Sequence, residues 1–187
     1  MKTKVLTAVL AAALALPLSA CSGSSGDSAS SASRSGTGAS AGASSASGFE
    51  TAGGVLTATD PEANLSDGAG VRITIEPGAT GKATFQLIDP ASGSDYSDCL
   101  VFDYAERTFV RHHDVAARGA AYDYTMSLDD QTLIAITDEQ GDDASEAVRR
   151  YGRWDSAQTE TADLLTTTQR YFQDKYGTTI EEQVVQG

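Results

Sequence analysis

Residues 71–88 read VRITIEPGATGKATFQLI, two alternating apolar and polar runs on either side of a turn rich in proline and glycine. Alternation with a period of two is typical of a β-strand with one buried face, and Pro and Gly favour a tight turn between such runs. The stretch therefore predicts an antiparallel hairpin with strands over 71–76 and 82–88. Its expected buried face consists of Val71, Ile73, Ile75, Ala83, Phe85 and Leu87.

Similar apolar runs flank this hairpin on both sides, and turn residues separate them. A polar loop over 89–98 is expected to follow the hairpin, and Asp129-Asp130-Gln131 to form a later turn. Because consecutive strands usually pair, we expect an antiparallel β-meander of about six or seven strands in a curled sheet. The expected strands cover 54–59, 71–76, 82–88, 99–104, 107–112, 120–128 and 132–137.

The last third of the chain changes to a helical period. Asp143-Ala144-Ser145-Glu146 has the pattern of a capping box and predicts a short helix to about Tyr151. Asp155-Ser156-Ala157-Gln158 predicts the start of a longer helix, which Gly177 should end. The fold class is therefore α+β, with two C-terminal helices packed on one side of the sheet. The expected buried stripe of the longer helix is Thr161, Leu164, Leu165, Thr168, Tyr171, Phe172 and Tyr176.

The N-terminal region has the three zones of a secretory signal. Lys2 and Lys4 supply positive charge, residues 5–16 are almost entirely Val, Leu and Ala, and small residues precede Cys21. The apolar run is too short to cross about 30 Å of hydrocarbon as a permanent helix. We therefore expect residues 1–20 to be a signal peptide.

The end of this region, Leu18-Ser19-Ala20-Cys21, resembles the lipobox of bacterial lipoproteins. In that family the cysteine thiol receives a diacylglyceryl group, a dedicated signal peptidase cuts before the cysteine, and the new amino terminus is often acylated. The resemblance implies cleavage between Ala20 and Cys21, lipidation of Cys21, and attachment to the extracytoplasmic face of the cell membrane. It covers only residues 1–21 and implies a location, whereas no family is recognised for the rest of the chain.

The segment after Cys21, residues 22–48, contains 12 Ser, 6 Gly and 6 Ala among 27 residues. Such a composition buries too little apolar surface to offset the entropy of ordering. Residues 21–48 are therefore expected to be a lipidated cysteine and a disordered tether with a root-mean-square length of about 30 Å.

Residues 49–187 are expected to form a single globular domain, whose 10 basic and 25 acidic residues give a formal charge of −15. So acidic a surface disfavours nucleic acid and anionic lipid as partners. The domain is therefore expected to be displayed away from the membrane, which it reaches only through the lipid on Cys21.

Few residues of this domain point to catalysis. Cys99 is expected to be a small buried strand residue, with His112 or His113 as a base only if their strands are adjacent. His112-His113-Asp114 is the most metal-like triplet, but adjacent strand residues point to opposite faces and no second ligand cluster follows. We predict no catalytic site, no metal and no cofactor, and retain these four residues as candidates.

Two other groups are candidates for ligand binding. Asp138 and Asp142 lie in an acidic turn and supply the oxygen ligands that calcium prefers, without the spacing of an EF-hand. Tyr122 and Tyr124 share one strand face, and Trp154 precedes the longer helix. Aromatic residues are enriched at interfaces, yet they are also common half-buried strand residues, which is the interpretation favoured here.

Three functions are compatible with these observations. The leading hypothesis is a binding or accessory module of the cell envelope, with an envelope protein or a cell-wall component as its partner. The alternative is a small extracytoplasmic hydrolase or metal-dependent enzyme that uses His112, His113, Asp114 or Cys99. A third is a structural subunit that docks through its helical face. The ligand, the oligomeric state and the type of envelope stay open.

Overall fold

The structure is a computed structural model, and it describes residues 48–78, 81–115 and 119–186. The predicted signal peptide, the lipobox with Ala20 and Cys21, and the predicted tether up to residue 47 lie outside the described residues. The described part has the α+β class predicted from the sequence, with eight strands followed by three helices. None of the described helices is both long enough and apolar enough to cross a membrane.

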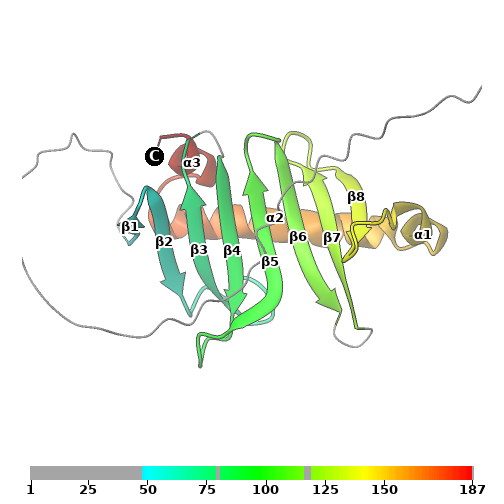
Figure 1. The fold of residues 1–187 in the computed structure, drawn as a ribbon, viewed down its shortest axis with the longest axis horizontal. Helices are drawn as coiled ribbons and strands as arrows, with labels where there is room; N and C mark the ends of the chain where they lie inside the picture. The colour runs from blue at the N-terminus through cyan, green and yellow to red at the C-terminus, as the bar shows by residue number, and fades with distance from the viewer. Residues whose placement is uncertain (1–47, 79–80, 116–118, 187) are drawn as a thin grey trace, which may run out of the picture. The chain divides into compact units, whose positions relative to one another are not determined.

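The strands form one antiparallel sheet in which each strand pairs with its neighbours in the sequence, in the order β1 to β8 (Figure 1). This arrangement confirms the predicted meander. The strands are β1 (Glu50–Ala52), β2 (Val55–Asp60), β3 (Gly70–Glu76), β4 (Lys82–Ile88), β5 (Asp95–Asp103), β6 (Thr108–Val115), β7 (Ala120–Ser127) and β8 (Leu133–Asp138).

The predicted number of strands and the predicted curl of the sheet are wrong. The strand that was not predicted is β1, which turns back onto β2 through Gly53 and Gly54, at φ 60° and 84°. Three residues are too few to show alternation, so the sequence pattern did not indicate this strand. The sheet is also open rather than strongly curled, with β1 and β8 at opposite edges. An open sheet suits the long helix that crosses it, because a straight helix cannot follow a strongly curved face.

The predicted loop over 89–98 is also too long, because β5 begins at Asp95. Asp95 pairs with Ile88 beyond a β-bulge in the β4–β5 ladder. The side chain of Gln86 donates hydrogen bonds to the carbonyls of Tyr96 and Asp98, at 2.6 and 3.2 Å, across this irregularity. A side-chain amide thus takes the place of regular ladder bonds, which lets the strand continue where the sequence looks like a loop.

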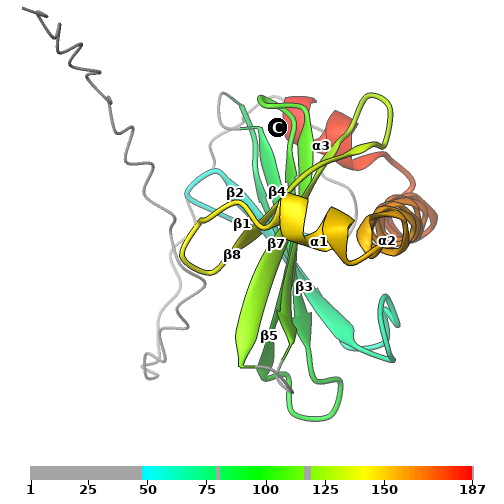
Figure 2. The ribbon, with the colours of Figure 1, turned by 90° about the vertical axis from the view of Figure 1, so that its right-hand side faces the viewer.

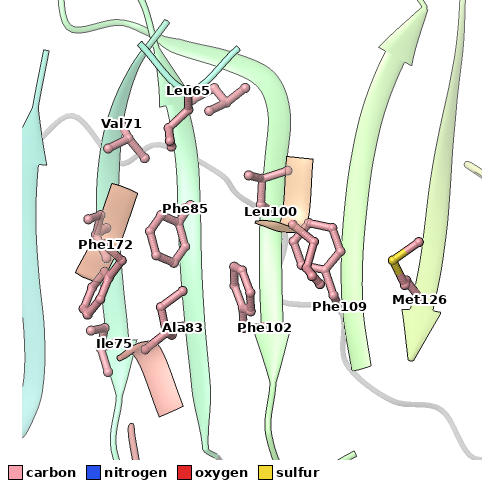
Figure 3. Packing of buried hydrophobic residues seen from close by; sticks show 14 of the residues in the cluster. Leu65, Val71, Ile75, Ala83, Phe85, Leu100, Phe102, Phe109, Met126 and Phe172 are labelled. Carbon is pink, nitrogen blue, oxygen red and sulfur yellow. The ribbon is translucent and has the colours of Figure 1, made fainter. Parts of the chain in front are cut away.

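The hairpin over 71–88 forms the centre of the hydrophobic core. All six residues of its predicted buried face are at most 4% exposed, and Ile73 pairs with Phe85 across the hairpin. Phe85 meets Phe102 of the next strand at a centroid distance of 5.4 Å and Phe172 of a helix at 6.0 Å (Figure 3). The apolar face of the sheet and the helical layer therefore share one core.

Three described helices, α1 (Ser145–Arg150), α2 (Trp154–Tyr176) and α3 (Ile180–Gln186), cover one side of the sheet (Figure 2). α2 runs across the strands rather than along them (Figure 1). Near its start, Gln158 accepts a hydrogen bond from the Leu133 N–H of β8, and near its end Phe172 packs on Phe85 of β4. The 23 residues of α2 rise about 35 Å, close to the width of eight strands spaced about 4.8 Å apart.

Two helical predictions need correction. The described residues contain a third helix, α3, which buries Ile180 and Val184 although it is only seven residues long. The second predicted capping box is not the helix start, because α2 already begins at Trp154 and Asp155 lies inside its first turn. The predicted end is confirmed, since Gly177 caps α2 in the left-handed conformation at φ 71°.

Asp60 fastens the C-terminal part of α2 to the sheet. Its Oδ2 accepts the Tyr171 hydroxyl at 2.7 Å and pairs with Lys175 Nζ at 3.0 Å, while its Oδ1 accepts the Glu62 N–H at 3.0 Å. Burial raises the pKa of the Asp60 carboxyl, but the hydrogen bonds outweigh burial and hold that pKa below its ordinary value. The carboxylate is therefore charged at neutral pH and can bind both helix residues at once.

The buried stripe of α2 includes two threonines that differ in hydrogen bonding. The Thr168 hydroxyl donates to the Leu164 carbonyl at 2.8 Å. Thr161 is fully buried, and its hydroxyl has no hydrogen-bond partner within the described part of the chain. A buried polar group without a partner costs free energy because its hydration is lost without compensation.

We expect Thr161→Val to raise the free energy of unfolding by about 1 kcal/mol, because it removes this uncompensated hydroxyl while keeping the side-chain shape. The matched control is Thr168→Val, which loses the hydrogen bond to the Leu164 carbonyl and should lower the free energy of unfolding by about 0.5–1 kcal/mol. Urea denaturation measures both in a soluble form that lacks the predicted signal peptide (residues 21–187 with Cys21→Ser), called the soluble mature chain below. Equal destabilisation by the two substitutions would contradict the explanation.

Candidate functional site

A pocket of about 750 Å³ opens between β6, β7, α1 and the first two turns of α2. This volume lies within the range of about 300–1,000 Å³ that small-molecule sites occupy. The strand residues that line it are Arg111, His113, Val115, Tyr122 and Tyr124. The helical side contributes Ala144, Ala147, Val148, Tyr151, Arg153, Ser156, Ala157 and Glu160.

The floor of the pocket is formed by four side chains, Arg111, His113, Tyr122 and Tyr124, which we call the floor quartet. Arg111 and His113 alternate along β6, and the sheet register places Tyr124 opposite Arg111 and Tyr122 opposite His113. Alternate residues of a strand share a face, so the four side chains project to the same side of the sheet. The guanidinium carbon of Arg111 lies 5.5 Å from the centre of the Tyr124 ring, within cation–π range.

Arg111 is the more buried cation of the pocket. Its side chain is 17% exposed, and its Nη1 lies 3.7 Å from Oε2 of Glu160, whose side chain is 62% exposed. An ion pair this long to an exposed carboxylate is weak, because water screens it and Glu160 loses side-chain entropy when it is held. The guanidinium is therefore held in place by Tyr124 while its charge is only loosely compensated.

His113 is oriented by a carboxylate from the neighbouring strand. Its Nδ1 lies 3.2 Å from Oδ1 of Asp98, which also accepts the Asp114 N–H at 2.7 Å. An ionised carboxylate only accepts hydrogen bonds, so Nδ1 must carry the proton. In the neutral ring, Nε2 is then an acceptor, and within the described residues it has no partner of its own. The neutral form of His113 thus adds a hydrogen-bond acceptor to the pocket beside the Arg111 cation.

The pocket is locally cationic although the domain is strongly acidic. Among the described residues, its lining contains Arg111 and Arg153 but only one carboxylate, Glu160. Arg153 is exposed and makes no ion pair with any residue that the structure describes. Tyr151, at 78% exposed, adds an open aromatic side chain at the helical side of the pocket.

The structure places the two predicted histidines on opposite faces of the sheet. His113 lines the pocket, whereas His112 binds Oδ1 of Asp123 through Nδ1 at 2.6 Å. Cys99, 8% exposed, pairs with His112 across β5 and β6, so the strands of these two candidates are adjacent. Asp114, the third member of the triplet, contributes its N–H to Asp98 and does not line the pocket.

The remaining candidates lie elsewhere. Asp138 closes its own turn, because its Oδ1 accepts the N–H groups of Gln140 and Asp142 at 3.0 and 2.9 Å. Trp154 is covered by the Arg149 guanidinium at 3.5 Å and does not line the pocket. Among the described residues, no three His, Cys, Asp or Glu side chains are grouped so as to hold one metal ion.

His113, Tyr122 and Tyr124 were predicted from the sequence as separate candidates, not as parts of one site. Arg111, Arg153 and Glu160 were not predicted. Arg111 could have been found by pairing the strand over 108–115 with the strand over 120–127. That register places Arg111 and His113 opposite two tyrosines. The helical contributions carry no such signal, because they depend on where α2 crosses the sheet.

Comparison of the chain with protein-family models, curated proteins and solved structures finds no match. The class of this protein is therefore described by its fold and its pocket alone. It is an α+β domain with an open antiparallel meander and a cationic, tyrosine-rich pocket.

We expect the neutral imidazole of His113 to carry its proton on Nδ1, because Asp98 accepts from that nitrogen. Long-range ¹H–¹⁵N correlation spectra of the soluble mature chain distinguish the two ring nitrogens. Asp98→Ala should shift His113 toward the other tautomer and leave His112, bound to Asp123, unchanged. A neutral His113 ring with its proton on Nε2 in the unsubstituted protein would refute the assignment.

Proposed function

We propose that this protein is a lipid-anchored, extracytoplasmic binding protein whose domain holds a small anionic ligand in the pocket between the sheet and the helices. The observation that carries the proposal is the charge of the pocket. Of the residues that the structure describes, two arginines and one glutamate line it, on a domain whose formal charge is −15. A local excess of cations on so acidic a surface is best explained by a ligand that carries negative charge.

The surroundings of the two arginines support a binding role. The Arg111 guanidinium lies over the Tyr124 ring at 5.5 Å from its centre, and its nearest described carboxylate is 3.7 Å away. A ligand carboxylate or phosphate that approaches in the bidentate geometry of an arginine fork would bind more strongly than Glu160 does. Tyrosines and the apolar side chains of Val115 and Val148 give the rest of such a ligand a surface to contact.

The charge of the domain also limits the ligand. Polyanions such as nucleic acid meet repulsion from the surrounding carboxylates, whereas a small anion interacts mainly with the nearest cations because salt screens beyond about 8 Å. The proposal is therefore restricted to small ligands with few charges.

The location is the second part of the proposal. It rests on the resemblance of residues 18–21 to a lipobox and on the Ser-, Gly- and Ala-rich composition of residues 22–48. A lipidated Cys21 followed by such a tether would present the pocket to the extracytoplasmic space, on the outer side of the cell membrane.

We expect carboxylates to bind the soluble mature chain about tenfold more tightly than their amides, because only the anion forms a charge-assisted hydrogen bond with Arg111. Benzoate with benzamide, and cyclohexanecarboxylate with its amide, are suitable pairs. NMR titration gives the dissociation constants and locates the shift changes, which should fall on the floor quartet. Arg111→Gln should remove the preference for the acid.

The matched control for that experiment is Arg150→Gln. Arg150 is an exposed residue of α1 that pairs with Glu146 and does not line the pocket. This variant should retain the full preference. Equal binding of acids and amides, or an equal effect of the two substitutions, would show that the pocket is not an anion site.

We expect Cys21→Ala to block lipid labelling and to leave the protein unprocessed or released from the membrane. The reason is that the thiol is the acceptor of the diacylglyceryl group, and two acyl chains are needed for stable attachment. Metabolic labelling with a radioactive fatty acid and fractionation of the cells measure the two effects. Unchanged membrane retention of this variant would refute the lipid anchor.

A second candidate function, a small extracytoplasmic hydrolase, is favoured by one observation. An imidazole oriented by a carboxylate, as His113 is by Asp98, is the arrangement of a general base, and here it lies in a pocket. Turnover of a bound ligand that is lost in His113→Gln while binding persists would support this candidate over a binding protein.

A further inference from the structure

The floor quartet contains two recognition points of different chemistry on one strand. Arg111 is a donor with positive charge, and His113 presents Nε2 as an acceptor when its Nδ1–H is bound to Asp98. Alternate residues of a strand are about 7 Å apart, which is the scale of a six-membered ring with its substituents. A ligand that satisfies both points must be an acid that also donates a hydrogen bond.

The tyrosines favour a ring as the body of this ligand. Tyr122 faces the pocket beside His113, and its hydroxyl has no hydrogen-bond partner in the described part of the chain. Tyr151 adds a second, open aromatic ring from the helical side. The negative face of an aromatic ring attracts the C–H groups of a sugar ring, and the tyrosine hydroxyls bind further ligand hydroxyls.

The charge balance favours one negative charge for each ligand. Among the described residues that line the pocket, the two arginines exceed Glu160 by one positive charge when His113 is neutral. The nearby carboxylate of Asp98 does not line the pocket and is already bound to His113 and to the Asp114 N–H. Glu160 is exposed and weakly paired, so the ligand carboxylate displaces it from Arg111 at little cost. The acidic domain around the pocket opposes ligands of higher negative charge.

We propose that the ligand is an acidic sugar of the uronate type, with its carboxylate on Arg111 and a ring hydroxyl donating to His113. This inference rests on the proposed function and specifies the ligand class of the same pocket. Tyr122 and Tyr151 contact the ring, and Glu160 occupies Arg111 when the ligand is absent.

Three probes of matched ring size test this assignment on the soluble mature chain. Methyl β-D-glucuronoside has the carboxylate and the hydroxyls, cyclohexanecarboxylate has only the carboxylate, and methyl β-D-glucoside has only the hydroxyls. We expect the glucuronoside to bind about tenfold more tightly than either of the others, because each of them lacks one hydrogen-bonding point. Titration calorimetry and NMR give the dissociation constants.

Substitutions assign the two points separately. His113→Phe should reduce the preference for glucuronoside over cyclohexanecarboxylate to within about twofold, and His113→Gln, which keeps an acceptor, should restore part of it. Arg111→Gln should remove the preference over the neutral glucoside. Glu160→Gln should tighten both acids a few-fold and leave the glucoside unchanged, because Arg111 loses its competing carboxylate.

The matched control is His112→Phe, which alters the neighbouring histidine on the opposite face of the sheet and should change none of the three constants. Thermal unfolding confirms that each variant is folded before binding is measured. Free sugar acids and uronate residues of a polymer present the same chemistry. Tighter binding of a tetraglucuronide than of the methyl glycoside would identify the polymer, and weaker binding the free sugar.

The possible failures are distinguishable. If cyclohexanecarboxylate binds as tightly as the glucuronoside and both depend on Arg111, the uronate assignment is overturned while the anion pocket stands. If neither acid binds, or if the glucoside binds as well as the acids, the proposed anion pocket is overturned together with the assignment.

Discussion

The structure depends on one constraint: the antiparallel meander has a wide apolar face, and the helical layer must cover it. α2 provides most of this cover because it runs across the strands rather than along them, from Leu133 of β8 to Asp60 of β2. Its 23 residues rise about 35 Å, nearly the width of the sheet. Contacts at both ends fix the crossing, through Gln158 on the β7–β8 turn and Tyr171 on Asp60. The open form of the sheet follows from the same geometry.

The pocket arises where this cover ends. Along one face of β6, the fully buried Phe109 is followed by Arg111 and His113, and on β7 the fully buried Met126 gives way to Tyr124 and Tyr122. The strands therefore change from apolar to polar at the margin of the helical layer, while the side chains continue to point toward the helices. Core and site are two parts of one sheet face, and the stability of the core positions the floor quartet.

The parts of the fold that the sequence could predict have local causes. The hairpin over 71–88 follows from alternation, and the end of α2 follows from Gly177. β1 and α3 were not predicted because segments of three and seven residues show too little periodicity. The start of α2 was predicted in the wrong place because the helix start at Trp154 lacks the side-chain cap on which the prediction relied. The site was less predictable still. Tyr122, Tyr124 and His113 were recognisable as candidates, but Glu160 and Arg153 reach them only through the path of α2 across the sheet.

The acidity of the domain and the cations of the pocket act at different distances. Beyond the screening length of about 8 Å, an approaching anion meets little of the domain's charge of −15; within it, the nearest groups decide. At the pocket the nearest groups are Arg111 and Arg153, and Arg111 is held in place by Tyr124. A carboxylate that enters therefore meets a preorganised guanidinium, whereas a long polyanion must also place its other charges against aspartates and glutamates. Selection for a small ligand of low charge thus follows from the contrast between the pocket and the surface around it.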